Sequence, residues 1–173
     1  MRSANCTPAA APQFALNRRD WTNHSFNDSG VIIMAAHVVL LVDDNDLYRG
    51  MLRSLLELHG YQVVPARNGT EGLACAAAAR IDAAVVDVDM PGMDGFEFCR
   101  QLKAQQLVAG REVPMWIITG AFRPALEKRA AASGALLVLR KPFPIAELRE
   151  NLERQFVKQA SPLAPEGSTQ NER

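Results

Sequence analysis

The chain has few cysteines and no excess of charge of either sign. Its three cysteines, Cys6, Cys75 and Cys99, have no paired spacing, which argues against a disulfide framework and against a zinc ribbon. Lysine and arginine together number 19, as do aspartate and glutamate, so the formal net charge is zero. A basic nucleic-acid-binding surface is therefore not expected. This composition predicts no nucleic-acid partner and fits a reducing compartment such as the cytoplasm.

Long apolar runs are absent too. The longest, residues 31–42, has twelve residues and is interrupted by His37, so it is too short to span a bilayer. The first thirty residues lack a basic segment followed by an apolar one, and they therefore do not resemble a secretory signal. We expect no membrane partner and a cytoplasmic location.

With 173 residues, the chain has room for one domain with tails. Residues 1–35 and 159–173 contain prolines and polar residues without periodicity, which predicts a disordered N-terminal extension and a disordered C-terminal tail. The ordered domain is expected over residues 36–158. Met34 stands just before this domain, so Met1 and Met34 both remain candidates for the true start.

Between these tails, short apolar segments alternate with segments of helical spacing. Strands are predicted at residues 37–42, 61–65, 81–87, 113–119 and 136–139. Helices are predicted at residues 47–58, from 68 through the alanines near Cys75, and at 94–107, 124–133 and 144–156. The strands are almost continuously apolar, which is typical of a parallel sheet covered on both faces. The predicted fold is therefore α/β, with five helices around a doubly wound, five-stranded parallel sheet.

Two of these helices are indicated by apolar residues at helical spacing. Those of the first helix are Leu47, Met51, Leu55 and Leu58, and the expected apolar stripe of the third helix is Phe96, Cys99, Leu102 and Leu107. Asp46 is well placed to cap the start of the first helix, and Gly60 is a signal for its end.

Polar residues stand at the ends of four predicted strands. Asp43 and Asp44 follow the first strand, Asp87 ends the third, Thr119 ends the fourth, and Lys141 follows the fifth. In open α/β sheets the chemistry lies beyond the carboxyl ends of the strands. We therefore expect these side chains to converge on one rim of the sheet.

This set of side chains suits a phosphate and a metal ion. Three clustered carboxylates repel one another, and a hard divalent cation such as Mg²⁺ removes this conflict. Lys141 supplies a positive charge to a phosphate at the same place, and Thr119 supplies a hydroxyl hydrogen bond. The only histidines are His24, His37 and His59, and no Ser–His or Cys–His nucleophile is apparent. The natural nucleophile is therefore a carboxylate, which can form an acyl phosphate.

Five short motifs stand at these strand ends and in the loops beside them. They are VDD at residues 42–44, VVDVDMPGMDG at 85–95, ITG at 118–120, GA at 134–135 and KPF at 141–143. Together they resemble the receiver domain of two-component response regulators, of the single-domain, CheY-like kind. The likeness covers residues 36–158, and the pairing of MPGMDG with KPF is highly specific. It implies a flavodoxin-like fold and a phosphorylation-dependent role in signalling.

The resemblance implies a role for each acid of the rim. Asp87 is implied to be the phosphoacceptor, and Mg²⁺ is the implied cofactor. The implied metal ligands are Asp44 directly, Asp43 through water, Asp87, and the backbone carbonyl of Asp89.

The resemblance also implies the phosphate-binding and switch residues, which are Thr119, Gly120 and Lys141. Lys141 is expected to pair with the phosphoryl group, and the Thr119 hydroxyl is expected to move toward it. The bond between Lys141 and Pro142 is implied to be cis, which costs only about 0.5–1 kcal/mol before a proline.

A receiver domain is implied to be a phosphoacceptor that assists its own phosphotransfer and dephosphorylation, not an enzyme. The implied donor is a histidine kinase or a phosphotransfer protein, and the implied readout is a downstream protein target. A homodimer through the face of residues 124–133, 136–139 and 144–156 is a further expectation. About seventeen residues follow residue 156, too few for a DNA-binding domain with its own core.

Two positions leave the function open. Val138 stands three residues before Lys141, where the family usually has Tyr or Phe, and a β-branched side chain cannot swing a ring in or out. Because of Val138, a phosphorylation-independent interaction module is kept as the alternative function. The Asp89 side chain stands where the family tunes the lifetime of the phosphoryl group. Three roles of the Asp89 side chain remain open. It could repel incoming phosphate, position a water molecule, or join the ligand shell of the metal.

Two other interpretations of the acids at residues 87–89 fit less well. A phosphatase of the haloacid dehalogenase type would have its Asp-x-Asp motif after the first strand, whereas Asp87 ends the third. An EF-hand loop starting at Asp87 would need an acid at its twelfth position, which is Phe98.

Overall fold

The computed structural model describes residues 25–26, 32–33, 37–121 and 125–160. The chain divides into two units, Met1–Ala35 and Ala36–Arg173. In the first unit, β1 (Ser25–Phe26) pairs with β2 (Ile32–Ile33) in antiparallel orientation. Most of the predicted N-terminal extension and the tail after residue 160 lie outside the described residues, so their predicted disorder stays a prediction.

The second unit is built on one parallel sheet, as predicted. Its strands, in spatial order, are β4 (Gln62–Ala66), β3 (Val38–Val42), β5 (Ala83–Asp87), β6 (Met115–Thr119) and β7 (Leu137–Arg140). The connecting helices are α1 (Asp46–Leu58), α2 (Gly69–Ala78), α3 (Gly95–Val108), α4 (Leu126–Ser133) and α5 (Ile145–Ala160). Numbered within this sheet, the strand order is 2-1-3-4-5, which is the flavodoxin-like order. The predicted fold class is confirmed.

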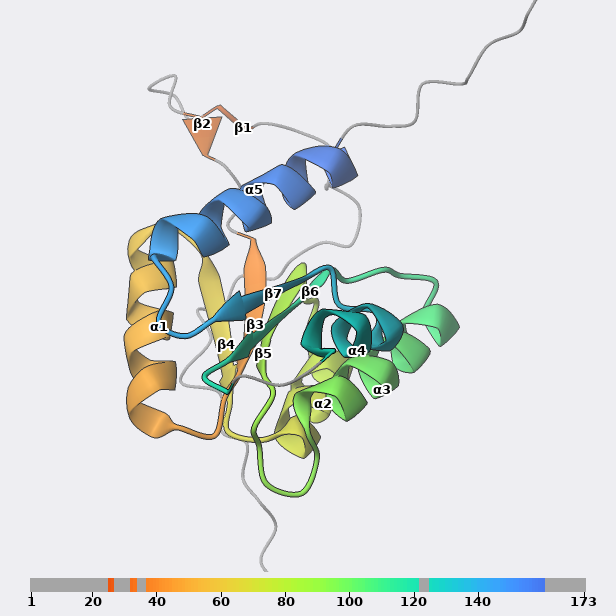
Figure 1. Ribbon diagram of the computed structural model, residues 1–173. Coiled ribbons are helices and arrows are strands. Elements are labelled where there is room, and N and C mark those ends of the chain that lie inside the picture. Colours follow the sequence, from red (N-terminus) through yellow and green to blue (C-terminus); the bar gives the residue numbers. More distant parts are fainter. Residues whose placement is uncertain (1–24, 27–31, 34–36, 122–124, 161–173) are drawn as a thin grey trace, which may run out of the picture. The chain divides into compact units, whose positions relative to one another are not determined.

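Both faces of the sheet are covered by helices. Alternate residues of β3 point to opposite faces, so Val39 and Leu41 pack with α1 and α5, while Leu40 and Val42 pack with α2, α3 and α4. Figure 1 shows these two helical layers on either side of the sheet. Each fully buried leucine contributes about 1.5–3 kcal/mol relative to an exposed one, which explains why the central strands are continuously apolar.

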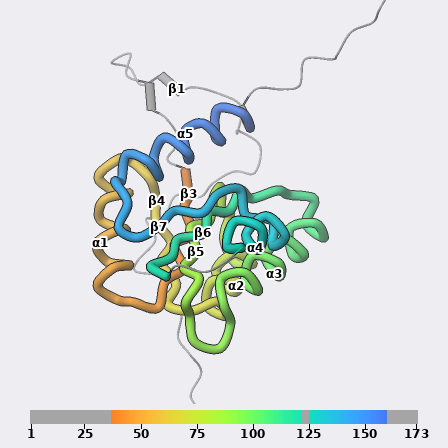
Figure 2. Tube along the Cα trace, viewed as in Figure 1, coloured from red at the N-terminus to blue at the C-terminus, as the bar shows by residue number. Residues whose placement is uncertain are grey.

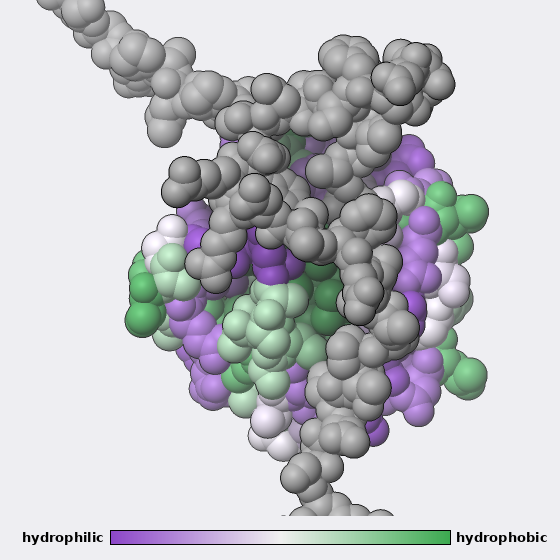
Figure 3. Space-filling model, turned by 180° about the vertical axis from the view of Figure 1, so that it is seen from behind, coloured by the Kyte–Doolittle hydropathy of each residue, from purple (hydrophilic) through white to green (hydrophobic). Residues whose placement is uncertain are grey.

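The structure corrects the predicted apolar stripes of α1 and α3. Leu47 and Leu58 are 87% and 79% exposed, and α1 packs through Leu52 and Leu56 instead. In α3, Phe96, Cys99 and Leu102 are buried as predicted, but Leu107 is exposed and Phe98 is buried. A leucine-rich helix has more than one row of apolar residues, and only contact with the sheet decides which row is buried. Green patches of exposed apolar residues accordingly interrupt the hydrophilic surface in Figure 3.

Side-chain caps fix the starts of three helices. Asn45, Asn68 and Asp94 each accept a hydrogen bond from the backbone N–H three residues later. Such a cap contributes about 1 kcal/mol. The cap of α1 is therefore Asn45 and not Asp46, because the cap must have extended backbone geometry and Asp46 is already the first helical residue.

The strand order directs two carboxylates to one place. β3 and β5 are neighbours at the centre of the sheet, where the order of connection reverses, and a ligand crevice forms at such a point. Asp43 follows β3 and Asp87 ends β5. The loops that follow these strands lie together at the lower edge of the domain in Figure 2.

One glycine allows the loop after Asp87 to return closely to its own strand. The Gly95 N–H donates to the Val88 carbonyl at 3.1 Å, and a Cβ on Gly95 would collide with the Asp87 carbonyl oxygen. No larger residue fits at the start of α3 without moving the backbone of the Asp87 strand.

We therefore predict that Gly95→Ala lowers the free energy of unfolding by about 1–3 kcal/mol, the usual cost of overpacking. Gly50→Ala is the matched control, because no atom lies within 4 Å of its Cβ position in α1. Alanine in a helix interior is favoured over glycine, so this change should raise the unfolding free energy by about 0.5–1 kcal/mol. Urea denaturation measures both, and equal effects would contradict the prediction.

Candidate functional site

Lys141 connects the two carboxylates at the centre of the rim. Its Nζ lies 2.6 Å from Asp43 Oδ2 and 2.6 Å from Asp87 Oδ1. The exposed fractions of the three side chains are 0% for Asp43, 6% for Asp87 and 18% for Lys141. A bridged, largely buried cluster of this kind differs from a surface ion pair, because water screens it little.

The second oxygen of each carboxylate is held by the backbone. Asp43 Oδ1 accepts from the Asn45 N–H at 2.8 Å, and Asp87 Oδ2 accepts from the Asp89 N–H at 2.7 Å. Every carboxylate oxygen of the pair therefore has a donor. Both side chains are fixed before any ligand arrives.

Tyr48 forms one wall of this cluster. The Lys141 Nζ lies 4.0 Å from the centre of the Tyr48 ring, within the range of a cation–π interaction. The neighbouring Arg49 donates through Nη1 to the Asp43 carbonyl oxygen at 2.6 Å. Neither Tyr48 nor Arg49 was predicted from the sequence to belong to the site. The sequence does show an aromatic residue in the first turn of the helix that follows Asp43 and Asp44. A local pattern of this kind does not indicate which residue the ring contacts.

The shared ammonium leaves the cluster with one excess negative charge. Burial alone would lower the pKa of Lys141, but its hydrogen bonds to Asp43 and Asp87, together with their charges, raise it above the usual value. Burial raises the pKa of Asp87, and the nearby Asp43 charge adds to this, whereas Lys141 opposes it. Two carboxylates and one cation are incompletely neutralised, which favours the arrival of a further cation.

Thr119 stands beside this cluster at the end of β6. Its carbonyl oxygen accepts from the Lys141 backbone N–H at 2.8 Å. Its hydroxyl accepts from the Ala121 N–H at 3.1 Å and donates to Asp89 Oδ2 at 3.4 Å. Among the described residues, apart from its chain neighbours, no atom lies within 4 Å of the Cβ position of Gly120.

The remaining expected site residues fall in three different surroundings. The Lys141–Pro142 peptide bond is cis, the isomer that the resemblance implied. Val138 lies on β7, pairs with Ile117 of β6 and packs against the core on the side of α2, α3 and α4. Asp44 is exposed, unlike Asp43.

The donor set fits a hard divalent cation with part of its shell supplied by water. Among the described residues, no three Asp, Glu, His or Cys side chains stand close enough together to hold a metal. Mg²⁺ needs only one or two carboxylates and keeps several waters. Asp43 and Asp87, which keep an excess negative charge beside Lys141, are two carboxylates of this kind.

Comparison with known proteins agrees with this geometry. Residues 39–153 match the family model of the response regulator receiver domain. The chain belongs to this family. The chemotaxis protein CheY4 of Vibrio cholerae, a solved structure, has 37% sequence identity and a TM-score of 0.64, and the match covers 69% of this chain and 98% of that one. The family's receiver domains act in phosphorylation-based two-component signalling.

Curated relatives are longer than this receiver domain. Response regulator MprA of Mycobacterium sp. (strain KMS) is 38% identical over 126 residues, which are 72% of this chain and 52% of that protein. Response regulator MprA of Mycobacterium avium (strain 104) is 40% identical over 112 residues, or 64% of this chain and 46% of that protein. The chain thus spans about half the length of the curated relatives it matches. None of its described helices has the length and apolar character needed to cross a membrane.

The different surroundings of Asp43 and Asp44 give a stability prediction. Asp43→Ala removes a partner from Lys141 and from the Asn45 N–H, so in EDTA it should lower the unfolding free energy by about 1–3 kcal/mol. Asp44→Ala is the matched variant, and its stability in EDTA should equal that of the wild type. Urea denaturation without metal tests both, and a large loss for Asp44→Ala would mean that Asp44 supports the fold.

Proposed function

We propose that Asp87 accepts a phosphoryl group from a histidine kinase or a phosphotransfer protein, with Mg²⁺, and that this changes which protein the domain binds. The observation that carries the proposal is the Lys141 bridge. It holds a nearly buried Asp87 carboxylate with one oxygen on the ammonium and the other on a backbone N–H. The nucleophile and the cation that offsets phosphoryl charge are thus already in place.

In the proposed step, an Asp87 carboxylate oxygen attacks the phosphorus of a phosphohistidine. The new O–P bond forms as the P–N bond breaks, and the bonding electron pair returns to the imidazole nitrogen of the donor. Lys141 then needs only a small movement to pair with the phosphoryl oxygens, because it already contacts Asp87. The protein acts here as the phosphoacceptor and not as a turnover enzyme.

Four residues would hold the metal in this scheme: Asp43, Asp44, Asp87 and Asp89 through its carbonyl. When bound, Mg²⁺ offsets negative charge on the transferred group and on the carboxylates around it. The fixed Asp43 and Asp87 side chains favour one position for such an ion, and the exposed Asp44 is free to turn toward it.

Thr119 is the proposed switch. Its hydroxyl now bonds to Asp89, so it must leave this partner to donate to a phosphoryl group on Asp87. No atom of the described residues, apart from the chain neighbours, lies within 4 Å of the Gly120 Cβ position, so none of them blocks a movement of the backbone there. This contact supports none of the three roles left open for the Asp89 side chain. It suggests a fourth role, in which Asp89 holds the Thr119 hydroxyl before phosphorylation.

The readout surface and its partners are part of the proposal. Leu136 and Leu137 are 54% and 38% exposed at β7, between α4 and α5. Exposed apolar residues there suit a downstream protein or a second copy of the domain. A cytoplasmic location, with no membrane or nucleic-acid partner, completes the proposal. The alternative is a phosphorylation-independent interaction module, which the small Val138 side chain favours.

The phosphoacceptor is tested directly by Asp87→Asn. The wild type should be labelled by acetyl phosphate only when Mg²⁺ is present, and the label should be acid-labile. The Asp87→Asn variant should carry roughly tenfold less label, or even less, because an amide is not a competent nucleophile here. Glu57→Gln on the exposed side of α1 is the control and should label normally. Undiminished labelling of Asp87→Asn would remove Asp87 as the acceptor.

Val138 generates a second prediction. A phosphoryl mimic, beryllofluoride with Mg²⁺, should shift NMR signals of residues 87–95 and 119–121 but only weakly those of β7, because no ring fills the space behind Thr119. Val138→Tyr should extend the shifts along β7 and into α5. Leu137→Tyr, which points to the other face of the strand, should not. Large wild-type shifts at β7 and α5 would show that the coupling needs no ring.

A further inference from the structure

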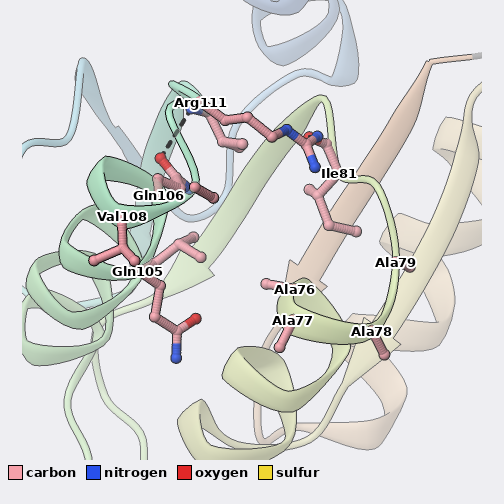
Figure 4. A pocket seen from close by; sticks show the side chains of 12 residues that line it. Ala76, Ala77, Ala78, Ala79, Ile81, Gln105, Gln106, Val108 and Arg111 are labelled. Atoms are coloured by element: carbon pink, nitrogen blue, oxygen red, sulfur yellow. Dashed lines mark hydrogen bonds between the residues drawn. The ribbon is translucent and has the colours of Figure 1, made fainter.

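A cavity lies away from the Lys141 bridge, between the carboxyl-terminal halves of α2 and α3. Its volume is about 560 Å³. Small-molecule sites in proteins commonly have volumes of about 300–1,000 Å³. Figure 4 shows Ala76, Ala77 and Ala78 of α2 on one side of it and Gln105 and Val108 of α3 on the other.

The cavity exists because α2 ends in small side chains. Residues 76–79 are all alanine, so at this end of α2 the side chains facing the cavity are no longer than a methyl group. The inner wall is apolar and buried, with Ile81, Leu102 and Val113. Ala77, Ala78 and Val108 at the mouth are exposed. An apolar body of a few carbons fits between these walls with one end open to water.

A buried amide in the wall lacks a partner. Gln106 is 8% exposed, and its Oε1 accepts from the Val113 N–H at 2.9 Å. This bond fixes the orientation of the amide, so its Nε2 is the donor end. Within the described part of the chain, Nε2 has no hydrogen-bond partner. A buried donor without an acceptor is unusual and costs stability, and it leaves a partial positive charge behind this wall of the cavity.

One cation stands across the mouth. The Arg111 backbone N–H donates to the Gln106 carbonyl at 3.0 Å, and its Nη2 donates to the Ile81 carbonyl at 3.2 Å. Figure 4 shows the Arg111 side chain reaching toward Ile81. A guanidinium has five N–H donors, so several remain for a ligand. Among the described residues that line the cavity, Arg111 alone is charged.

We propose that this cavity binds a small monocarboxylate, with its apolar body against the alanines and its carboxylate on Arg111. Two observations select this chemistry. The lining offers one positive charge, which matches one carboxylate and leaves a second anionic group unpaired. The unpaired Gln106 Nε2 behind the wall is a donor, and its partial positive charge favours an acceptor over a donor on the ligand. Guanidinium and carboxylate also match in shape, as two parallel N–H···O bonds.

The site is separate from the phosphoryl chemistry. Ile81 precedes β5 and Val113 precedes β6, whereas Asp87 and Thr119 stand at the opposite ends of the same two strands. Binding of the carboxylate should therefore not require Asp87. This independence distinguishes the proposal from the proposed function of the domain.

The probe is hexanoate, with hexanamide as its uncharged counterpart, titrated into the full chain and followed by ¹H–¹⁵N NMR. Hexanoate should give saturable shifts at residues 76–79 and 105–113, in the wild type and in Asp87→Asn alike. Hexanamide should bind about tenfold more weakly, as should hexanoate to Arg111→Gln, because a charge-assisted hydrogen bond is lost. Arg53→Gln, on α1, is the control for the loss of a charge and should bind normally.

Filling the cavity gives an independent arm of the test. Ala77→Leu adds bulk at the mouth and should abolish the saturable shifts, whereas Ala74→Leu, an exposed position of α2 outside the lining, should leave them unchanged. The ¹⁵N spectrum of each variant reports whether it folds. The proposal is wrong if wild-type shifts do not saturate, if hexanoate and hexanamide bind equally, or if a folded Ala77→Leu binds like the wild type.

Discussion

Two buried carboxylates share one ammonium group at the carboxyl edge of the sheet, and the other features of the site depend on this shared cation. A carboxylate as buried as Asp43 is costly unless it is paired and fully hydrogen-bonded. Lys141 and the backbone donors meet that requirement for Asp43 and Asp87 together. Removing the Lys141 ammonium would leave both buried carboxylates uncompensated, a change that typically costs about 3–5 kcal/mol.

The fold provides this arrangement through strand order. The three charged residues come from the ends of β3, β5 and β7, so they meet only if all three strands run parallel and in register. β3 and β5 are buried almost throughout, and packing on both faces of the sheet favours this one register. The close return of the chain at Gly95 and the caps on α1 and α3 then fix the loops that follow Asp43 and Asp87. A phosphoryl group on Asp87 would therefore meet side chains that these contacts already hold in position.

The sequence predicted the parts of this structure that follow from chain-wide patterns. Apolar strands alternating with helices indicate a doubly wound sheet, and the sheet brings the residues that follow its strands to one edge. Asp43, Asp87 and Lys141 could therefore be placed together before their contacts were seen. The proposal that they form a phosphoacceptor site rests on the family resemblance, since a buried ion cluster alone does not specify phosphotransfer.

Features that depend on side-chain packing could not be predicted. The leucines of α1 occupy several rows, and the contact with β3 decides that Leu52 and Leu56 are buried and Leu47 is not. Tyr48 meets Lys141 only through the angle between α1 and the end of β7. The cavity between α2 and α3 depends on how far two helices stand apart where one carries only alanines. Neither an angle nor a separation of helices is encoded in a local sequence pattern.

A double-mutant cycle on Lys141 and Asp43 in EDTA tests the central claim most directly. Unfolding free energies would be measured in urea for the wild type, Lys141→Met, Asp43→Asn and the double variant. If the ammonium compensates the buried carboxylate, the two changes are coupled, and the interaction energy should exceed about 1 kcal/mol. Additivity within about 0.5 kcal/mol, the behaviour of independent sites, would contradict the account.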